Sequence, residues 1–225
     1  MTEEKTATGE EATKAQEDLA GKEAEAEPET PAMPEEGEKD ADGNHMLEYK
    51  WTLWFDSHTK GQSQTNYGES RKKVFTFSTV EDFWRLYNNI KMPSDFQPNT
   101  DYCLFKEGIE PEWEDARNEK GGCWTVQTQR QDSKDADDFW MTASMAMVGE
   151  AFEEGEEICG LFCSIRNRGN RIQVWTRNAD NEDAQKSIGK QLKDVMNIKE
   201  DGRLAFSAHT DSKKGPRHPK ERYVI

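Results

Sequence analysis

The sequence contains no long apolar run and few of the features that mark a secreted, membrane-spanning or metal-binding protein. Among its 225 residues no eighteen consecutive side chains are apolar, and no apolar signal region follows the N-terminus. Only four cysteines occur and none forms a CxxC pair, so we expect reduced thiols in the cytosol. A P-loop, a GxGxxG fingerprint and an HExxH motif are also absent, which argues against the common nucleotide-binding and metalloprotease classes.

Apolar side chains are scarce, and the shortage is concentrated at one end of the chain. Hydrophobic residues make up 33% of the sequence, which is low for a packed protein. Residues 1–43 lack Trp, Tyr, Phe, Ile and Val and carry fifteen acidic and four basic side chains, a formal charge of −11. This segment cannot bury enough apolar surface to offset its ordering entropy, so we predict a disordered acidic N-terminal tail. Residues 44–225 hold all seven Trp and a charge of −4, and are predicted to form one folded domain.

Hydrophobic periodicity predicts short strands alternating with amphipathic helices. Strand signals cover 51–55, 102–105, 124–129, 158–165, 172–177 and 204–208. A helix is expected after Ser78, whose spacing to Glu81 is typical of a capping box, and further helices are expected at 137–148 and 184–196. The segments 56–71 and 109–117 are predicted loops. This order predicts an α+β fold in which an antiparallel sheet is covered on one face.

The two cysteines of the strand at 158–165 are predicted to be packing residues. Period-two alternation places Cys159, Leu161, Cys163 and Ile165 on one apolar face. A zinc site would need further Cys or His at ligand spacing, and none is nearby. Free cysteine is among the most buried residue types, which favours the core interpretation.

Three arginines surround the predicted hairpin turn at 166–171. Arg166, Arg168 and Arg171 lie within six residues, in a turn whose Gly and Asn residues suit positive φ angles. Alternation on the returning strand places Arg171 and Trp175 on the same face. Guanidinium groups bind phosphate bidentately, so the cluster suits a short phosphate chain; an ordinary solvated hairpin tip is the alternative. Because the domain is slightly acidic, any contact with nucleic acid should be small and local.

The loop at 109–117 places an aromatic ring beside carboxylates. Trp113 can stack on a base, and a neighbouring carboxylate such as Glu114 can accept N–H groups from the edge of guanine. The alternative is a Trp that folds back onto the core, with the carboxylates in water. Sequence alone does not set the carboxylate separation that hydrolase chemistry requires, and His209 has no evident Ser or Cys partner motif.

Five stretches together resemble the eukaryotic translation initiation factor 4E family of cap-binding proteins, in their order and spacing. The similarity covers roughly residues 45 to 225, and the stretches are His45–Phe55, Ser78–Tyr87, Tyr102–Asp115, Gly121–Trp124 and Val174–Thr176. The resemblance implies a curved antiparallel sheet with three helices on its convex face and a slot for the 7-methylguanosine cap of messenger RNA on its concave side. It implies a translation initiation factor that recruits a scaffold protein, and not an enzyme.

The resemblance also implies roles for individual residues. Tyr67 and Trp113 match the two aromatic rings that sandwich methylguanine, Glu114 the carboxylate on the guanine edge, and Trp175 the contact to the methyl group. Arg166, Arg168 and Arg171 match the basic positions that face the cap phosphates. A partner site for a short helix of scaffold factor 4G or of repressor proteins is implied at His45, Val80, Trp84, Met141 and Gly149. No cofactor, no metal ion and no membrane contact are expected, and the protein is expected to be a monomer.

Some positions depart from the family pattern, and two other functions stay open. Tyr67 stands where Trp is usual, Cys123 where a basic residue is common, and Met141 and Thr142 where Leu and Glu are more usual. The first alternative is a cap-binding repressor that does not recruit the scaffold, and the second is an enzyme that processes nucleotides or caps. The location implied is cytoplasmic, with an additional nuclear pool as an alternative.

Overall fold

The computed structural model describes residues 37–57, 71–129, 133–200, 202–213 and 220–225. Residues Gly37–Ile225 group into one compact unit. Residues 1–36 and Tyr67 lie outside the described residues, so the disorder of the tail and the domain boundary at 43/44 stay predictions. The first described feature is a turn in which the backbone N–H of Asn44 donates to Asp40 Oδ1 over 2.9 Å.

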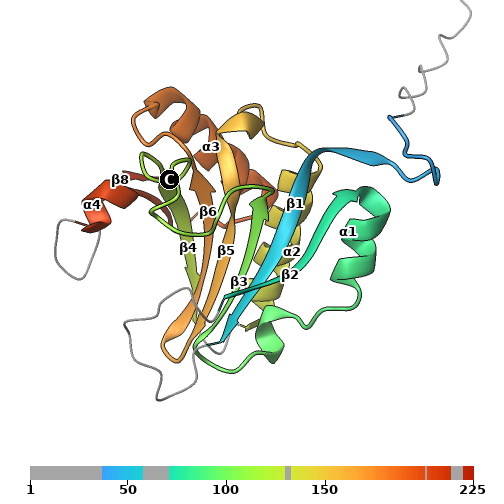
Figure 1. Ribbon diagram of the computed structural model, residues 1–225. Helices are drawn as coiled ribbons and strands as arrows, with labels where there is room; N and C mark the ends of the chain where they lie inside the picture. Colours follow the sequence, from blue (N-terminus) through green and yellow to red (C-terminus); the bar gives the residue numbers. More distant parts are fainter. Residues whose placement is uncertain (1–36, 58–70, 130–132, 201, 214–219) are drawn as a thin grey trace, which may run out of the picture. The chain divides into compact units, whose positions relative to one another are not determined.

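The elements of the described unit alternate between strands and helices along the chain (Figure 1). In chain order they are β1 Met46–Ser57, β2 Lys72–Thr79, α1 Val80–Tyr87, β3 Thr100–Lys106, β4 Gly122–Thr128, α2 Ser133–Val148, β5 Ile158–Arg166, β6 Gly169–Thr176, α3 Glu182–Val195, β7 Leu204–Ala208, α4 His209–Lys213 and β8 Glu221–Val224. Short 3-10 helices lie at Pro93–Asp95 and Gly155–Glu157. No helix among the described residues is long and apolar enough to cross a membrane.

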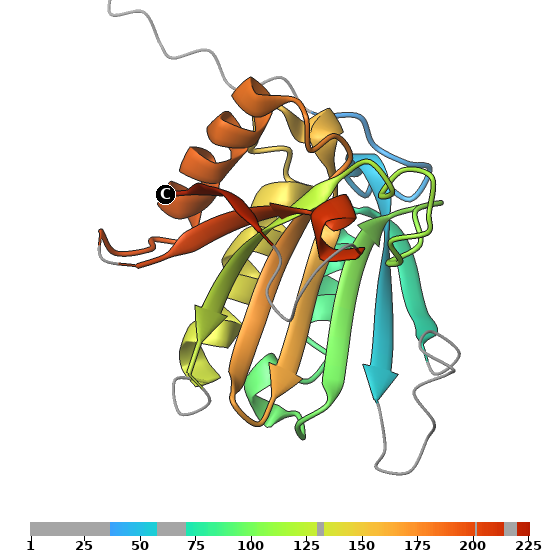
Figure 2. The same cartoon turned by 90° about the vertical axis from the view of Figure 1, so that its left-hand side faces the viewer.

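The eight strands form one curved sheet whose neighbours are all antiparallel. Their order across the sheet is β2-β1-β3-β5-β6-β4-β7-β8. Helices α1, α2 and α3 lie on one face, and the segment between β3 and β4 projects on the other (Figures 1 and 2). The predicted α+β fold, an antiparallel sheet with three helices on one face, is therefore confirmed.

Apolar side chains pack on both faces of the sheet. The larger core lies between the sheet and the helices and includes Trp51, Trp124 and Trp140, all at most 2% exposed. A second group, which we call the concave-face cluster, consists of strand and loop residues on the opposite face. Its members are Trp54, Cys103, Phe105, Ile109, Cys123, Cys159, Phe162 and Trp175. The face opposite α1, α2 and α3 therefore carries an apolar surface that can serve as the floor of a ligand site.

Two edge strands and one helix start differ from the sequence prediction. Strands β2 and β8 were not predicted; β8 has only four residues, and the lysines at the start of β2 hide its alternation. Helix α2 begins at Ser133, four residues earlier than expected. The Ser78–Glu81 capping box is also wrong. Thr79 is the N-cap of α1 and accepts from the backbone N–H of Asp82, and the Glu81 carboxylate contacts the imidazole of His45.

A bulge at the start of β5 corrects the predicted common face of the two cysteines. Ile158 pairs with Thr176 and Gly160 pairs with Trp175, so Cys159 is an extra residue and the alternation shifts by one. Cys159 consequently joins the concave-face cluster, while Cys163 lies in the larger core. Both thiols are free and buried, as predicted, but they serve opposite faces of the sheet.

The β5–β6 turn needs glycine at only one of its positions. Gly169 has a φ of +142°, and a Cβ there would lie 2.6 Å from the carbonyl oxygen of Thr128. The positive-φ residues of the described chain do not include Asn167 or Asn170, so the expectation for the turn asparagines is wrong. The turn brings Arg166 and Gly169 into direct pairing at one end of the sheet.

Candidate functional site

The segment between β3 and β4, residues 107–121, carries the predicted aromatic and carboxylate pair; we call it the Trp113 loop. Its conformation is fixed from inside by Asn118, which is fully buried. The Asn118 amide donates to the carbonyl oxygens of Glu110 and Glu112 over 2.7 and 2.9 Å. Asp115 accepts from the backbone N–H groups of Glu110 and Arg117. These bonds turn Trp113 outward, where 42% of its surface is exposed.

Replacing Asn118 with Ala should therefore destabilise the loop. Two carbonyl oxygens would lose their buried donor, which costs about 1–3 kcal/mol of unfolding free energy. Urea denaturation of the full chain measures this loss. Glu119→Ala, an exposed change in the same loop, is the matched control and should stay within about 0.5 kcal/mol of the parent. Equal stability of the two variants would contradict the role of Asn118 in holding the loop together.

Trp175 forms the floor of the concave face beside this loop. Its ring stacks on Phe162 with 5.7 Å between centroids and an interplanar angle of 11°. Phe105 meets it edge-on at 5.5 Å, and the imidazole of His209 lies 4.3 Å away. With 4% of its surface exposed, Trp175 is held rigidly, so it can only present a fixed surface to a ligand. His209 thus supports this floor, a role that its sequence context did not reveal.

The middle of the concave face is polar but neutral. The Gln173 amide donates to Cys123 Sγ over 3.3 Å and to Thr125 Oγ1 over 3.1 Å. Burial raises the pKa of Cys123 to about 11, so the thiol is uncharged near neutral pH. The hydrogen bond with Thr125 and the charge of Arg171 lower this pKa, but less than burial raises it. On β6, the exposed positive charge of this face is Arg171, near the β5–β6 turn.

The structure separates the three predicted arginines into one that is paired and two that are exposed. Arg166 forms a bidentate ion pair with the buried carboxylate of Asp101, at 2.5 and 3.0 Å, and also donates to the carbonyl oxygen of Thr100. Arg168 and Arg171 are exposed near the same turn. Arg166 is thus a fixed part of the sheet end, whereas the other two are accessible to an incoming anion.

Arg71 is a residue near the site that the sequence analysis missed. It precedes β2, and only 4% of its side chain is exposed; its Nη1 lies 3.3 Å from Glu112 Oε1 in the Trp113 loop. A buried arginine in a polar segment leaves no distinctive sequence pattern, because its partner is 41 residues away. Tyr67, the predicted second ring, lies outside the described residues, and its position opposite Trp113 stays a prediction.

The predicted partner residues lie on the helix-bearing face. The backbone N–H of Val80 donates to the carbonyl oxygen of His45, and His45 Nδ1 lies 2.7 Å from Glu81 Oε1. Val80 and Trp84 on α1 are each 37% exposed. Met141 is half-buried on α2, and Gly149 directly follows that helix. Figure 1 shows α1 and α2 on the same side of the sheet.

No cluster of three or more His, Cys, Asp or Glu in the described residues could hold a metal ion. Burial also raises the pKa of Cys159 to about 12, so this thiol is protonated near neutral pH. The arrangement is therefore suited to non-covalent binding: an exposed indole beside a carboxylate, a rigid aromatic floor, and accessible guanidinium groups farther along the sheet.

Comparison with known proteins connects this arrangement to one family. The family model described as Eukaryotic initiation factor 4E matches residues 46–223. The chain is similar to eukaryotic translation initiation factor isoform 4E of Prunus domestica, with 43% identity over 183 residues, which cover 81% of this chain and 84% of that protein. It is also similar to eukaryotic translation initiation factor 4E-1 of Zea mays, with 45% identity over 80% of this chain and 81% of the relative.

Solved structures of similar proteins carry ligands and a partner. The structure of Ascaris suum eIF4E-3 with the m2,2,7G cap is 38% identical, with a TM-score of 0.75, and the match covers 81% of this chain and 98% of that chain. The complex of Caenorhabditis elegans eIF4E-3 with the 4E-binding protein Mextli and a cap analog is 37% identical, with a TM-score of 0.74 and coverages of 81% and 99%.

Proposed function

This chain belongs to the eukaryotic initiation factor 4E family, and from this premise we propose that it binds the 7-methylguanosine cap of messenger RNA and recruits a scaffold factor to initiate translation. The single observation that carries the proposal is the exposed Trp113, with Glu114 next to it, in a loop that projects on the face of the sheet where Trp175 is buried (Figure 1). In this arrangement a cationic base can stack, donate N–H groups to a carboxylate and contact an aromatic floor.

The spacing along β6 supports binding of a nucleotide with a phosphate chain. Trp175 and Arg171 lie on the same face of β6, four residues apart, which corresponds to about 13 Å at strand rise. A base over Trp175 would therefore place its phosphates near Arg171 and the β5–β6 turn. We assign base recognition to Trp113, Glu114 and Trp175, with Tyr67 as the second ring, and phosphate recognition to the arginines.

Retention on a 7-methylguanosine-triphosphate resin tests the proposal. The full chain should bind the resin and should be released by free 7-methylguanosine triphosphate but not by unmethylated GTP. The methyl group makes the base cationic, so stacking on indole is stronger for the methylated ligand. Equal release by both nucleotides would show general nucleotide binding and would contradict the assignment.

The partner face favours recruitment over simple occupation of caps. Val80 and Trp84 present an exposed apolar surface on α1, and such a surface is typical of sites that receive an amphipathic helix. A repressor without scaffold binding stays the alternative, and a pull-down with a scaffold peptide separates the two.

We further propose that the protein acts without catalysis, as a monomer in the cytoplasm. Release of nucleotide products from capped RNA would contradict the non-enzymatic role.

Arg168 and Arg171 should read phosphates and not the base. We expect Arg168→Gln and Arg171→Gln each to weaken binding of 7-methylguanosine triphosphate by roughly 0.5–1.5 kcal/mol and to lower its salt dependence. Binding of 7-methylguanosine without phosphates should stay unchanged in fluorescence titrations. Equal losses for both ligands would contradict the assignment.

Arg166→Gln is a less clean test of the same role. It would break the ion pair between Arg166 and the buried carboxylate of Asp101, so it should lower stability as well as affinity.

A further inference from the structure

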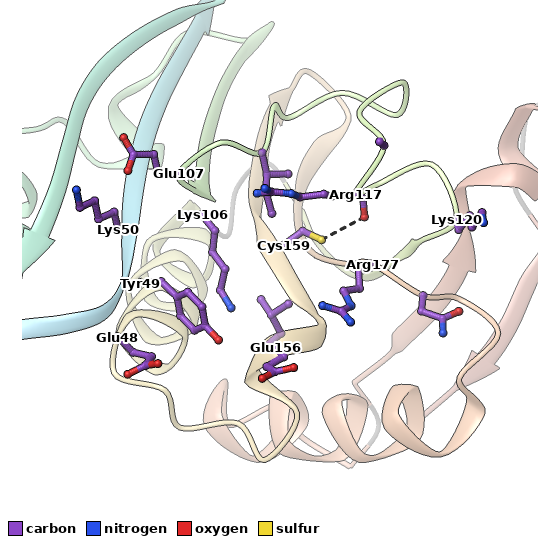
Figure 3. A pocket seen from close by; sticks show the side chains of 14 residues that line it. Glu48, Tyr49, Lys50, Lys106, Glu107, Arg117, Lys120, Glu156, Cys159 and Arg177 are labelled. Atoms are coloured by element: carbon purple, nitrogen blue, oxygen red, sulfur yellow. Dashed lines mark hydrogen bonds between the residues drawn. The ribbon is translucent and has the colours of Figure 1, made fainter.

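A pocket opens at the opposite end of the sheet from the β5–β6 turn. Its volume is about 720 Å³, within the usual range for small-molecule sites. It lies where β3 ends and β5 begins, and Figure 3 shows its side chains around Cys159. One wall is the inner part of the Trp113 loop, and the others come from β1 and from the residues that follow β6. The lining residues are Glu48, Tyr49, Lys50, Lys106, Glu107, Ile109, Ala116, Arg117, Lys120, Glu156, Ile158, Cys159, Arg177 and Asn178.

The pocket gathers positive charge in a domain that is acidic overall. Five lysine and arginine side chains line it against three glutamates. Among the residues that the structure describes, no carboxylate forms an ion pair with Lys106, Arg117 or Lys120. Arg177 has one long contact, 3.7 Å from its Nε to Glu157 Oε1. We call Lys106, Arg117, Lys120 and Arg177 the cationic wall of the pocket. Their charges are therefore available to an anion.

Lys106 is the most constrained of these cations. Only 7% of the residue is exposed, and its Nζ donates to the carbonyl oxygen of Gly155 over 2.8 Å and lies 3.4 Å from the centroid of the Tyr49 ring. Both partners are neutral. Burial lowers the pKa of Lys106, as expected of an ammonium group withdrawn from water. An anion in the pocket would supply the counter-charge that its direct partners lack.

The chemistry of the lining indicates the class of ligand. Two guanidinium forks, from Arg117 and Arg177, and the ammonium of Lys120 suit a multiply charged tetrahedral anion better than a single carboxylate. The floor is apolar, since Ile109, Ile158 and Cys159 are all at most 7% exposed. We propose that this pocket binds a small phosphate ester, with its phosphate toward the cationic wall and its organic part over this floor.

A free phosphate ester fits this position better than the phosphates of the bound RNA. The cap phosphates are assigned to the β5–β6 turn, and the pocket lies at the start of β5. Ile158 and Arg166 are eight residues apart in one strand, about 26 Å at strand rise. An RNA chain joined to those phosphates would therefore start at the far end of the sheet from the pocket. The inference thus goes beyond the proposed function.

The test is an NMR titration of the isotope-labelled full chain with its concave slot already filled by 7-methyl-GpppG. Inorganic pyrophosphate and AMP are the probes, and adenosine is the control without phosphate. We expect both phosphates to shift the amides of Lys106, Arg117 and Arg177 and adenosine to leave them unchanged. Absence of these shifts, or shifts confined to residues 166–171, would overturn the proposal.

Variants then test whether the cationic side chains of the pocket bind pyrophosphate and AMP. Arg117→Gln combined with Lys120→Gln should weaken both probes at least tenfold, and Lys190→Gln, an exposed change on α3, should have no effect. Undiminished binding in the double variant would refute the site. If the double variant weakened a capped RNA decamer while pyrophosphate did not bind to the parent, the ligand would be RNA and the proposal would be wrong.

The proposal for the pocket and the proposal of cap binding can be contradicted independently of each other. If 7-methyl-GpppG does not bind, the proposed function fails, and the titration is repeated on a chain carrying Arg168→Gln and Arg171→Gln. Those changes remove the exposed cations of the concave slot, so a remaining phosphate signal reports only on the pocket.

Discussion

Glu114→Ala should reduce the affinity for 7-methylguanosine triphosphate by roughly 10- to 150-fold, which corresponds to about 1.5–3 kcal/mol. The exposed carboxylate can accept two N–H groups from one edge of guanine, and alanine would leave both donors without a partner in a slot that the stacked base partly closes. Quenching of tryptophan fluorescence by the ligand measures the change.

Two further variants make this result specific. Glu114→Gln keeps the size but places an amide donor against the donors of the base, so it should lose nearly as much affinity. Glu119→Ala removes an exposed carboxylate from the same loop and should bind as the parent does. If Glu119→Ala lost as much as Glu114→Ala, the effect would come from general loop electrostatics, and the direct role of Glu114 would be wrong.

Trp84→Ala should abolish binding of a scaffold peptide while leaving cap affinity intact. Val80 and Trp84 are exposed apolar residues of α1, whereas Phe83 and Tyr87 of the same helix are buried. The Trp84 ring meets Phe83 and Tyr87 edge-on, at 5.1 and 5.9 Å, so its removal should lower the melting temperature slightly. Peptide titration, cap titration and thermal denaturation of one sample measure all three quantities.

Trp113→Ala is the matched control on the other face, because Trp113 is similarly exposed. It should lose cap affinity and keep peptide binding, which is the reverse of the Trp84→Ala pattern. A melting temperature of Trp84→Ala far below that of Trp113→Ala would mean that Trp84 is chiefly a core residue. Loss of cap binding in both variants would contradict the separation of the two faces.

Much of the fold was predictable because its signals are local. Alternation located six of the eight strands, and helical spacing located α1, α2 and α3, with errors of a few residues at their ends. Strand β2 was missed because polar residues dominate its start, and β8 because it is short. The capping box was placed one residue early, since Thr79 as well as Ser78 has a suitable side chain, and in the structure Thr79 accepts from the backbone N–H of Asp82.

The sequence by itself determined which side chains could form the site. Trp113 and Glu114 are adjacent, and Arg168, Arg171 and Trp175 follow one turn and one strand, so short-range geometry was enough to group them. Only the tertiary structure decided which of the three arginines is paired, because the Arg166–Asp101 pair joins residues 65 apart. The same holds for Cys159, whose face depends on a bulge in the pairing of β5 with β6. It holds also for the pocket around Cys159, which exists because β1, β3, β5 and the Trp113 loop meet at one end of the sheet. Contacts between distant segments follow from strand register and loop closure, and a single sequence carries no local pattern for either.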